Sequence, residues 1–212
     1  MPTLSVLCAL CALLFSSCSN ASQPPPASPP AQTAPPPAAS AATSRVVGKI
    51  AAAGTENPPV IVLEPKTARA FPPQSEEPVM DQVSATFGPS LLFVRTGQPT
   101  EFRNSDDTLH NVHVTHEDSH EGQFNVAIPT GEHYVFTFKR DGFYHVGCDI
   151  HPSMSAEIFA AASPYVTTAD GDGSFTFEDV EPGAYAITVY AGGKRFQKDV
   201  EIKNGVTNLV VE

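Results

Sequence analysis

Short apolar runs with alternating polar positions recur along the chain from residue 46 onward, and most are bounded by Gly, Pro, Asn or Asp. A period of two is typical of half-buried β-strands, and the sequence shows no helical periodicity of useful length. The pattern predicts strands at 46–50, 60–63, 83–87, 90–94, 100–103, 110–115, 123–127, 133–138, 143–147 and 155–160. Short strands at this spacing predict an all-β protein built as a Greek-key β-sandwich.

The first two predicted strands, 46–50 and 60–63, are separated by a stretch that contains Gly and Pro, which predicts a hairpin. The Pro-rich segment 69–78 predicts a loop along the edge of a sheet. Residues 44–78 either open the main sandwich or pair with the end of the chain, and the pattern leaves both arrangements open.

The alternation of inward-facing and outward-facing side chains predicts different orientations for His110 and His113. Val112 and Val114 must lie on the core face of their strand, so His110 points inward at the strand end and His113 points outward. The same test on residues 144–148 turns Tyr144, Val146 and Cys148 inward and leaves His145 at the surface.

The segment Cys148-Asp149-Ile150-His151-Pro152-Ser153-Met154 follows that last strand. Its thiolate, imidazole and thioether are each three residues apart, a spacing that fits one tight loop around a single metal ion. With His110 as a second imidazole, the donors become two His, one Cys and a weak axial Met, which is the donor set of a blue-copper electron-transfer centre.

This metal loop, together with the segment 110–114, resembles the cupredoxins, and within them the short-loop amicyanin type. The resemblance covers residues 79–162 and implies a cupredoxin-type sandwich with one type 1 copper ion. It implies His110, Cys148, His151 and Met154 as copper ligands. It also implies that Asn111 ties the two ligand loops together.

Residues 1–18 are apolar and uncharged, and their apolar run is too short to span a membrane, so they predict an export signal. The stretch 14–18 resembles a bacterial lipobox, which implies lipidation of Cys18. The alternative is the ordinary signal of a soluble periplasmic protein. Residues 19–43 are rich in Pro, Ala and Ser and predict a disordered, extended linker. We therefore expect a periplasmic lipoprotein anchored to the outer membrane.

Three of the four cysteines lie within residues 1–18, which leaves Cys148 as a lone thiol in the folded part of the chain. A lone thiol in an oxidising compartment is reactive unless something occupies it, and a bound metal does so. The alternative is a buried, inert Cys that acts as a small hydrophobic residue.

Residues 1–43 carry no charged side chain, so the net charge of −11 falls on residues 44–212. An acidic surface argues against nucleic acid and against an anionic membrane face as partners, and it favours redox partner proteins with a basic surface. We expect membrane contact only through a lipid anchor.

All seven histidines fall between residues 110 and 151. His113, His116 and His120 are interleaved with acidic residues and predict a mobile acidic loop, which is a candidate second site for exchangeable Cu(II) or Zn(II). The alternative is a solvated polar loop without a metal.

Composition changes at about residue 163, where an Asp-Gly turn, an aromatic strand at 174–177 and a Pro-Gly-x-Tyr turn at 182–185 follow one another. These motifs resemble the carboxypeptidase regulatory-like family of small transthyretin-like β-sandwiches. The resemblance implies a second β-sandwich over residues 163–212. We expect a cupredoxin-like domain over 44–162 before it, and its start stays open because both arrangements of residues 44–78 remain. It implies packing or partner binding, with no catalysis.

Together these features predict an exported type 1 copper protein that transfers single electrons in the periplasm and is not an enzyme. Two other functions remain open: copper binding and delivery, favoured by the additional histidines, and a surface structural module with a vestigial metal site.

Overall fold

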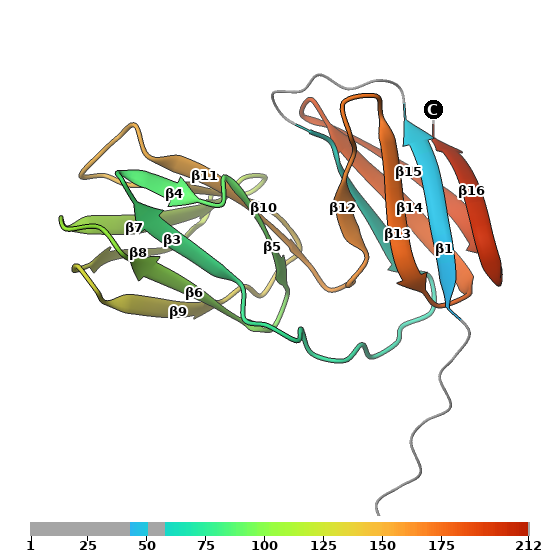
Figure 1. Ribbon diagram of the computed structural model, residues 1–212, viewed down its shortest axis with the longest axis horizontal. Helices are drawn as coiled ribbons and strands as arrows, with labels where there is room; N and C mark the ends of the chain where they lie inside the picture. The colour runs from blue at the N-terminus through green and yellow to red at the C-terminus, as the bar shows by residue number, and fades with distance from the viewer. Residues whose placement is uncertain (1–42, 51–57, 212) are drawn as a thin grey trace, which may run out of the picture. The chain divides into compact units, whose positions relative to one another are not determined.

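The computed structural model describes residues 43–50 and 58–211. This part of the chain contains sixteen β-strands and no helix, so the predicted all-β fold is confirmed (Figure 1). Among the described residues, therefore, no helix has the length and apolarity needed to cross a membrane. The predicted signal segment, Cys18 and nearly all of the predicted linker lie outside the described residues.

The first β-sandwich comprises the strands β3 to β11. Its five-stranded sheet has the order β5-β11-β10-β7-β8, and its four-stranded sheet has the order β4-β3-β6-β9 (Figure 1). The strand bounds are β3 Val79–Val83, β4 Thr86–Gly88, β5 Leu91–Arg95, β6 Pro99–Asn104, β7 His110–His116, β8 Gly122–Ile128, β9 His133–Thr137, β10 Gly142–Gly147 and β11 Ser155–Ala161.

The core of the first sandwich is apolar and strongly aromatic, and it includes fully buried Phe102, Phe138 and Tyr144. The ring centroids of Phe138 and Tyr144 lie 4.6 Å apart, within the range in which aromatic pairs attract one another. Val112 and Val114 of β7 are also fully buried, as the alternation predicted. This core encloses Cys148 and Met154 as well.

The predicted strand 83–87 is wrong, because the chain turns at Ser84 and Ala85 between β3 and β4. Both residues have positive φ angles, of 53° and 52°, which is unusual for residues other than Gly. The side chain of Asp106 accepts hydrogen bonds from the two backbone N–H groups, each at 2.7 Å. A distant carboxylate therefore stabilises this turn, and no local sequence signal marks it.

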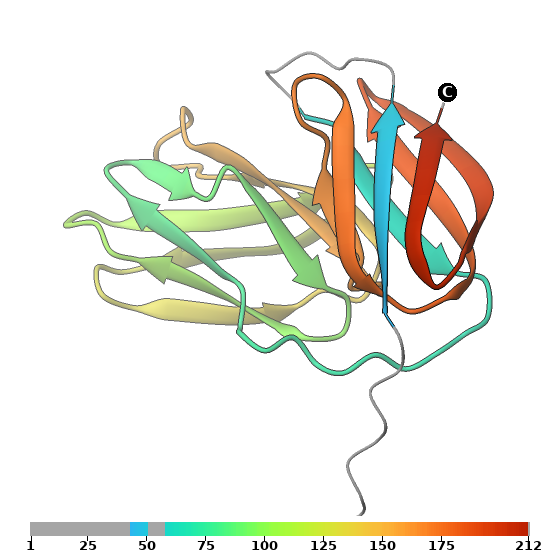
Figure 2. The same cartoon turned by 45° about the vertical axis from the view of Figure 1, so that its right-hand side comes forward.

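The second β-sandwich consists of a three-stranded sheet, β13-β1-β16, and a four-stranded sheet, β12-β2-β14-β15. Figure 2 shows β1 between β13 and β16. The strand bounds are β1 Ser44–Ile50, β2 Val60–Pro65, β12 Val166–Thr168, β13 Ser174–Val180, β14 Gly183–Ala191, β15 Lys194–Ile202 and β16 Gly205–Val211. Its core includes fully buried Val46, Ile61, Tyr185 and Ile187.

The predicted hairpin between 46–50 and 60–63 is wrong, because β1 and β2 lie in different sheets. Strand β1 pairs with β13 and, in parallel, with β16, whereas β2 pairs with β12 and β14. Residues 44–65 therefore pair with the end of the chain, which is one of the two arrangements that the sequence left open. In chain order, the first sandwich is inserted between β2 and β12.

Candidate metal centre

Two adjacent strands bring the predicted donors to one end of the five-stranded sheet. Strand β7 begins at His110, and its antiparallel neighbour β10 ends at Gly147, directly before Cys148. The register pairs Gly147 with His113. The start of β7 and the segment after β10 therefore meet at the same edge.

His110, Cys148 and His151 form one group of donor atoms that all lie within 4.8 Å of one another. The Nδ1 atoms of the two imidazoles are 2.9 Å apart, and the Cys148 sulfur is 4.0 Å from Nδ1 of His151. In the part of the chain that the structure describes, no other group of three such residues is this close.

These separations fit a single small metal ion. Sulfur and imidazole nitrogen bind such ions at about 2.3 and 2.0 Å, so two donors of one ion are at most about 4.3 Å apart. The Nδ1–Nδ1 distance of 2.9 Å and the sulfur–Nδ1 distance of 4.0 Å both satisfy this limit. One thiolate and two imidazoles are a soft and borderline donor set that suits copper in both oxidation states.

The carboxylate of Asp106 contacts the ring nitrogen of His110 that is not directed at the other two donors. Nε2 of His110 lies 2.9 Å from Oδ2 of Asp106, so its other ring nitrogen, Nδ1, is left to face Cys148 and His151. Hydrogen bonds from the Ala85 N–H and from His110 lower the pKa of Asp106 below its usual value, because they favour the ionised carboxylate. His110 itself is completely buried.

The metal loop is closed by its own backbone. The N–H of Cys148 donates to the carbonyl of Met154 at 3.3 Å, and the N–H of Met154 donates to the carbonyl of His151 at 2.9 Å. Cys148 and Met154 are 4% and 2% exposed and belong to the same core cluster. The structure therefore places Met154 beside the three-donor group, with its side chain in the core.

Asn111 connects the two ligand segments. Its Oδ1 accepts hydrogen bonds from the N–H groups of Asp149 and Ile150, at 2.8 and 3.3 Å, and lies 3.2 Å from the sulfur of Cys148. Its Nδ2 donates to Oδ1 of Asn125 and to Oδ2 of Asp149. Because both ends of the amide are engaged, its orientation is fixed.

Asp149 is the centre of a polar network beside the thiol. Its carboxylate accepts hydrogen bonds from Asn125 at 2.7 Å and from Asn111 at 3.1 Å, and it contacts Nδ1 of His113 at 3.1 Å. These contacts, with that of Asn125 the largest, lower the pKa of Asp149 below its usual value. A negative charge is therefore held one residue from Cys148.

His151 is the one member of the three-donor group that is not buried. Two exposed apolar side chains directly precede the histidines of the group in sequence. They are Leu109, 48% exposed, and Ile150, 47% exposed. The surface beside the candidate metal centre is therefore apolar at these two positions.

The structure does not bring the predicted secondary metal set together. His116 is buried as the last residue of β7, where its ring packs edge-on against Tyr144. His120 is exposed, and His113 contacts Asp149 instead. The prediction that His113, His116 and His120 share one loop site is therefore wrong. The alternation of β7 continues one residue beyond the predicted strand end, which puts His116 on the same face as Val112 and Val114.

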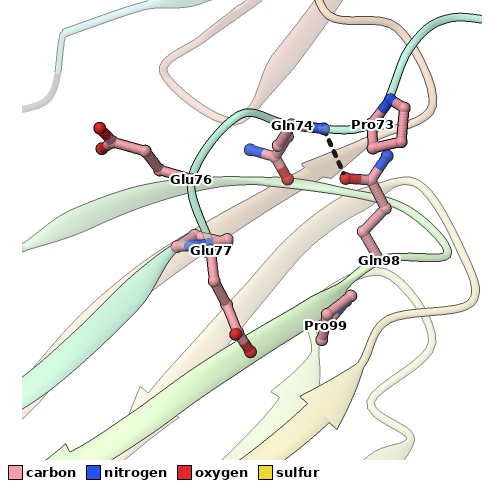
Figure 3. Close-up of a pocket in the computed structure, with 7 residues that line it drawn as sticks. Pro73, Gln74, Glu76, Glu77, Gln98 and Pro99 are labelled. Atoms are coloured by element: carbon pink, nitrogen blue, oxygen red, sulfur yellow. Dashed lines mark hydrogen bonds between the residues drawn. The ribbon is translucent and has the colours of Figure 1, made fainter.

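A hollow of about 240 Å³ is lined by the loop after β2 and by the start of β6 (Figure 3). The backbone N–H of Gln74 donates to Oε1 of Gln98 at 2.8 Å across it. Its lining contains neither His nor Cys, so it offers none of the donors that define the metal centre.

The residues of this centre lie within a segment that matches a known protein family. Residues 77–160 match the family described as copper binding proteins, plastocyanin/azurin family. The first sandwich is similar to these copper proteins. Residues 126–209 match a second family, described as polysaccharide lyase family 4, domain II. The predicted resemblance of the second sandwich to the carboxypeptidase regulatory-like family has no such match and stays a prediction.

Solved structures similar to the chain include copper proteins. A Cu(I) mutant of amicyanin is 22% identical over 40% of this chain and 82% of that chain, with a TM-score of 0.36. A purple cupredoxin from Nitrosopumilus maritimus is 18% identical over 40% of this chain and all of that chain, at 0.36. A copper-containing nitrite reductase from Thermus scotoductus is 27% identical over 46% of this chain and 25% of that chain, at 0.37. Among curated proteins, no sequence matches this chain.

Proposed function

We propose that the chain is an exported type 1 copper protein that transfers single electrons and catalyses no reaction of its own. The observation that carries this proposal is the convergence of His110, Cys148 and His151 at one buried end of the first sandwich. The family match over residues 77–160 supports copper as the ion.

We assign His110, Cys148 and His151 as the strong ligands and Met154 as a weak fourth. Bound copper would supply one-electron chemistry by alternating between Cu(I) and Cu(II). The protein's part is to hold the donors in place: Asp106 fixes His110, and the hydrogen bonds of the metal loop fix Cys148 and Met154. Because packing and hydrogen bonds restrain these side chains, little rearrangement should accompany a change of charge.

His151 is the proposed electron port, since the other two donors are buried. Leu109 and Ile150 give the port an apolar surround, which suits a contact that forms and separates quickly. The net charge of −11 favours partner proteins with a basic surface. The second sandwich would then serve in packing or partner binding.

A periplasmic location, with Cys18 as lipid anchor at the outer membrane, is part of the proposal and is supported by the sequence of residues 1–43. Mass spectrometry of the mature chain isolated from its host tests it. A lipidated N-terminal Cys18 is the expected result, and a mature chain that starts elsewhere without lipid would reject the anchor.

The decisive experiment adds Cu(II) to the purified apoprotein. An intense visible thiolate-to-copper band and reversible one-electron voltammetry are expected, and Cys148→Ser should lose the band because the thiolate is removed. Several copper ions in fast exchange without the band would favour copper delivery. Failure to take up copper would leave a structural module with a vestigial site.

A further inference from the structure

A second hollow, of about 440 Å³, lies beside the metal loop, and the metal centre itself forms part of its lining. Cys148 and Met154 line it together with residues of β7 and β10, among them His113 and His145. Of the described residues in this lining, only Asp149 carries a carboxylate. A side chain that enters the hollow therefore meets a negative charge directly beside the thiol.

The Asp149 carboxylate is fixed in position but not fully used. Its Oδ2 accepts hydrogen bonds from Nδ2 of Asn125 at 2.7 Å and from Nδ2 of Asn111 at 3.1 Å, and its Oδ1 lies 3.1 Å from Nδ1 of His113. A carboxylate offers about four acceptor positions, so about one remains for a donor from outside. The side chain is 57% exposed, and such a donor can therefore reach it from solvent.

The charge of this carboxylate determines which kind of side chain the hollow suits. The contacts with Asn125 and His113 lower the pKa of Asp149 below its usual value, because they favour the ionised form. The net charge of −11 has the same sign. An acidic group is therefore repelled from the hollow, and the N–H groups of a Lys or Arg side chain are attracted to it.

Asp149 also lies at the edge of the proposed electron port. It directly precedes exposed Ile150, and His151 follows. The port is thus apolar at Leu109 and Ile150 and charged beside them. In protein contacts, complementary charges set the orientation and the rate of association more than the affinity, which suits a complex that must form quickly and separate again.

We propose that the hollow receives a Lys or Arg side chain of the redox partner, which pairs with Asp149 while an apolar surface of the partner covers Leu109 and Ile150. This inference rests on the proposed electron transfer and adds the group that orients the partner. The net charge attracts basic proteins to the whole surface, whereas Asp149 selects the encounter in which the partner lies against the metal loop.

Stopped-flow oxidation of the Cu(I) protein tests this docking with two probes, basic cytochrome c and anionic ferricyanide. In each reaction copper gives one electron to the ferric iron of the probe. Asp149→Asn keeps the shape of the side chain and removes its charge. At low ionic strength the rate with cytochrome c should fall by about two- to fivefold, the size of effect that a partly exposed ion pair commonly gives. The rate with ferricyanide should rise.

The opposite signs separate docking from a change in the copper site, because a shift in midpoint potential moves both rates in the same direction. Asp118→Asn is the matched control, since Asp118 is an exposed carboxylate in the turn after β7, whose opposite end begins with His110. Equal rates with cytochrome c in Asp149→Asn and Asp118→Asn would overturn the proposal, as would two rates that change in the same direction.

Chemical-shift mapping on the apoprotein with reduced cytochrome c tests docking without electron transfer. Amide signals of Thr115 and His145, which line the hollow, should move, and Asp149→Asn should reduce these shifts. If the protein takes up no copper but the shifts depend on Asp149, the docking surface stands while the proposed electron transfer fails. If copper cycles reversibly but the shifts lie elsewhere, electron transfer stands and the docking proposal is wrong.

Discussion

Asp106 offers the sharpest test of how the candidate metal centre is held. Its two carboxylate oxygens serve three donors: Oδ1 accepts from the N–H of Ser84, and Oδ2 accepts from the N–H of Ala85 and contacts Nε2 of His110 at 2.9 Å. The substitution Asp106→Asn keeps the shape of the side chain but turns one oxygen into an N–H₂ donor. The N–H₂ group of the amide must then face at least one N–H donor, and it cannot accept a hydrogen bond from that donor.

The consequence follows for either orientation of the amide. If the amide nitrogen faces Ser84, the β3–β4 turn loses a hydrogen bond. If it faces His110, the imidazole loses the contact that aims Nδ1 at Cys148. Loss of such an outer contact commonly lowers metal affinity by about 10–100-fold. We therefore expect Asp106→Ala, which removes every one of these contacts, to weaken copper binding by about that factor. Asp106→Asn should weaken copper binding less than Asp106→Ala but more than removal of a nearby surface charge does.

The assay is competitive titration of each apoprotein with a copper chelator, followed by voltammetry of the loaded form. Asp107→Asn is the matched control, since Asp107 is the adjacent exposed carboxylate and has the same charge. If Asp106→Asn alters affinity and midpoint potential no more than Asp107→Asn does, overall charge explains the effect and the positioning argument is refuted.

Three further predictions concern stability. Asn104 is completely buried and its side chain makes three hydrogen bonds. Each such bond contributes about 0.5–1.5 kcal/mol, so Asn104→Ala should lower the free energy of unfolding, measured by urea denaturation, by about 2–4 kcal/mol. A loss below about 1 kcal/mol would contradict this. Hydrogen bonds from Ser174 lower the pKa of Asp172 to about 2. The ionised Asp172 carboxylate therefore stabilises the fold above its usual pKa of 3.8, and this stabilisation is lost as the pH falls toward 2. Asp172→Asn should destabilise the protein at pH 6 but not at pH 2, and an equal effect on stability at both pH values would contradict this prediction. A Cβ at Gly48 would stand 2.0 Å from the ring of Phe175; Gly48→Ala should cost about 1–3 kcal/mol in thermal unfolding, and unchanged stability would show that the ring moves freely.

The alternation of β7 and β10 predicted much of the site's surroundings from sequence. A strand permits only two faces, so buried Val112 and Val114 also determine the direction of His110. The spacing of Cys148, His151 and Met154 then identified the loop, because a short segment of fixed spacing restricts where its side chains can lie. Both constraints act between residues close together in the chain, so a single sequence is enough to predict them.

Contacts between residues far apart in the chain could not be predicted from the sequence in this way. Nothing in the sequence around Asp106 indicates that the β3–β4 turn lies against it. Strands β1 and β2 looked like a hairpin, because their true partners lie more than a hundred residues further along the chain. His145 was correctly placed at the surface, but only the structure shows that it pairs with Thr115 of β7.

The insertion of the first sandwich between β2 and β12 sets an order for assembly. Residues 79–161 form a continuous stretch, so this sandwich has all of its strands as soon as that stretch leaves the ribosome. Strand β1 is made earlier but pairs with β16, which ends at Val211. Because chains fold from the N-terminus during synthesis, one edge of β1 stays unpaired until β13 has been made, and the other edge stays unpaired until β16 has been made.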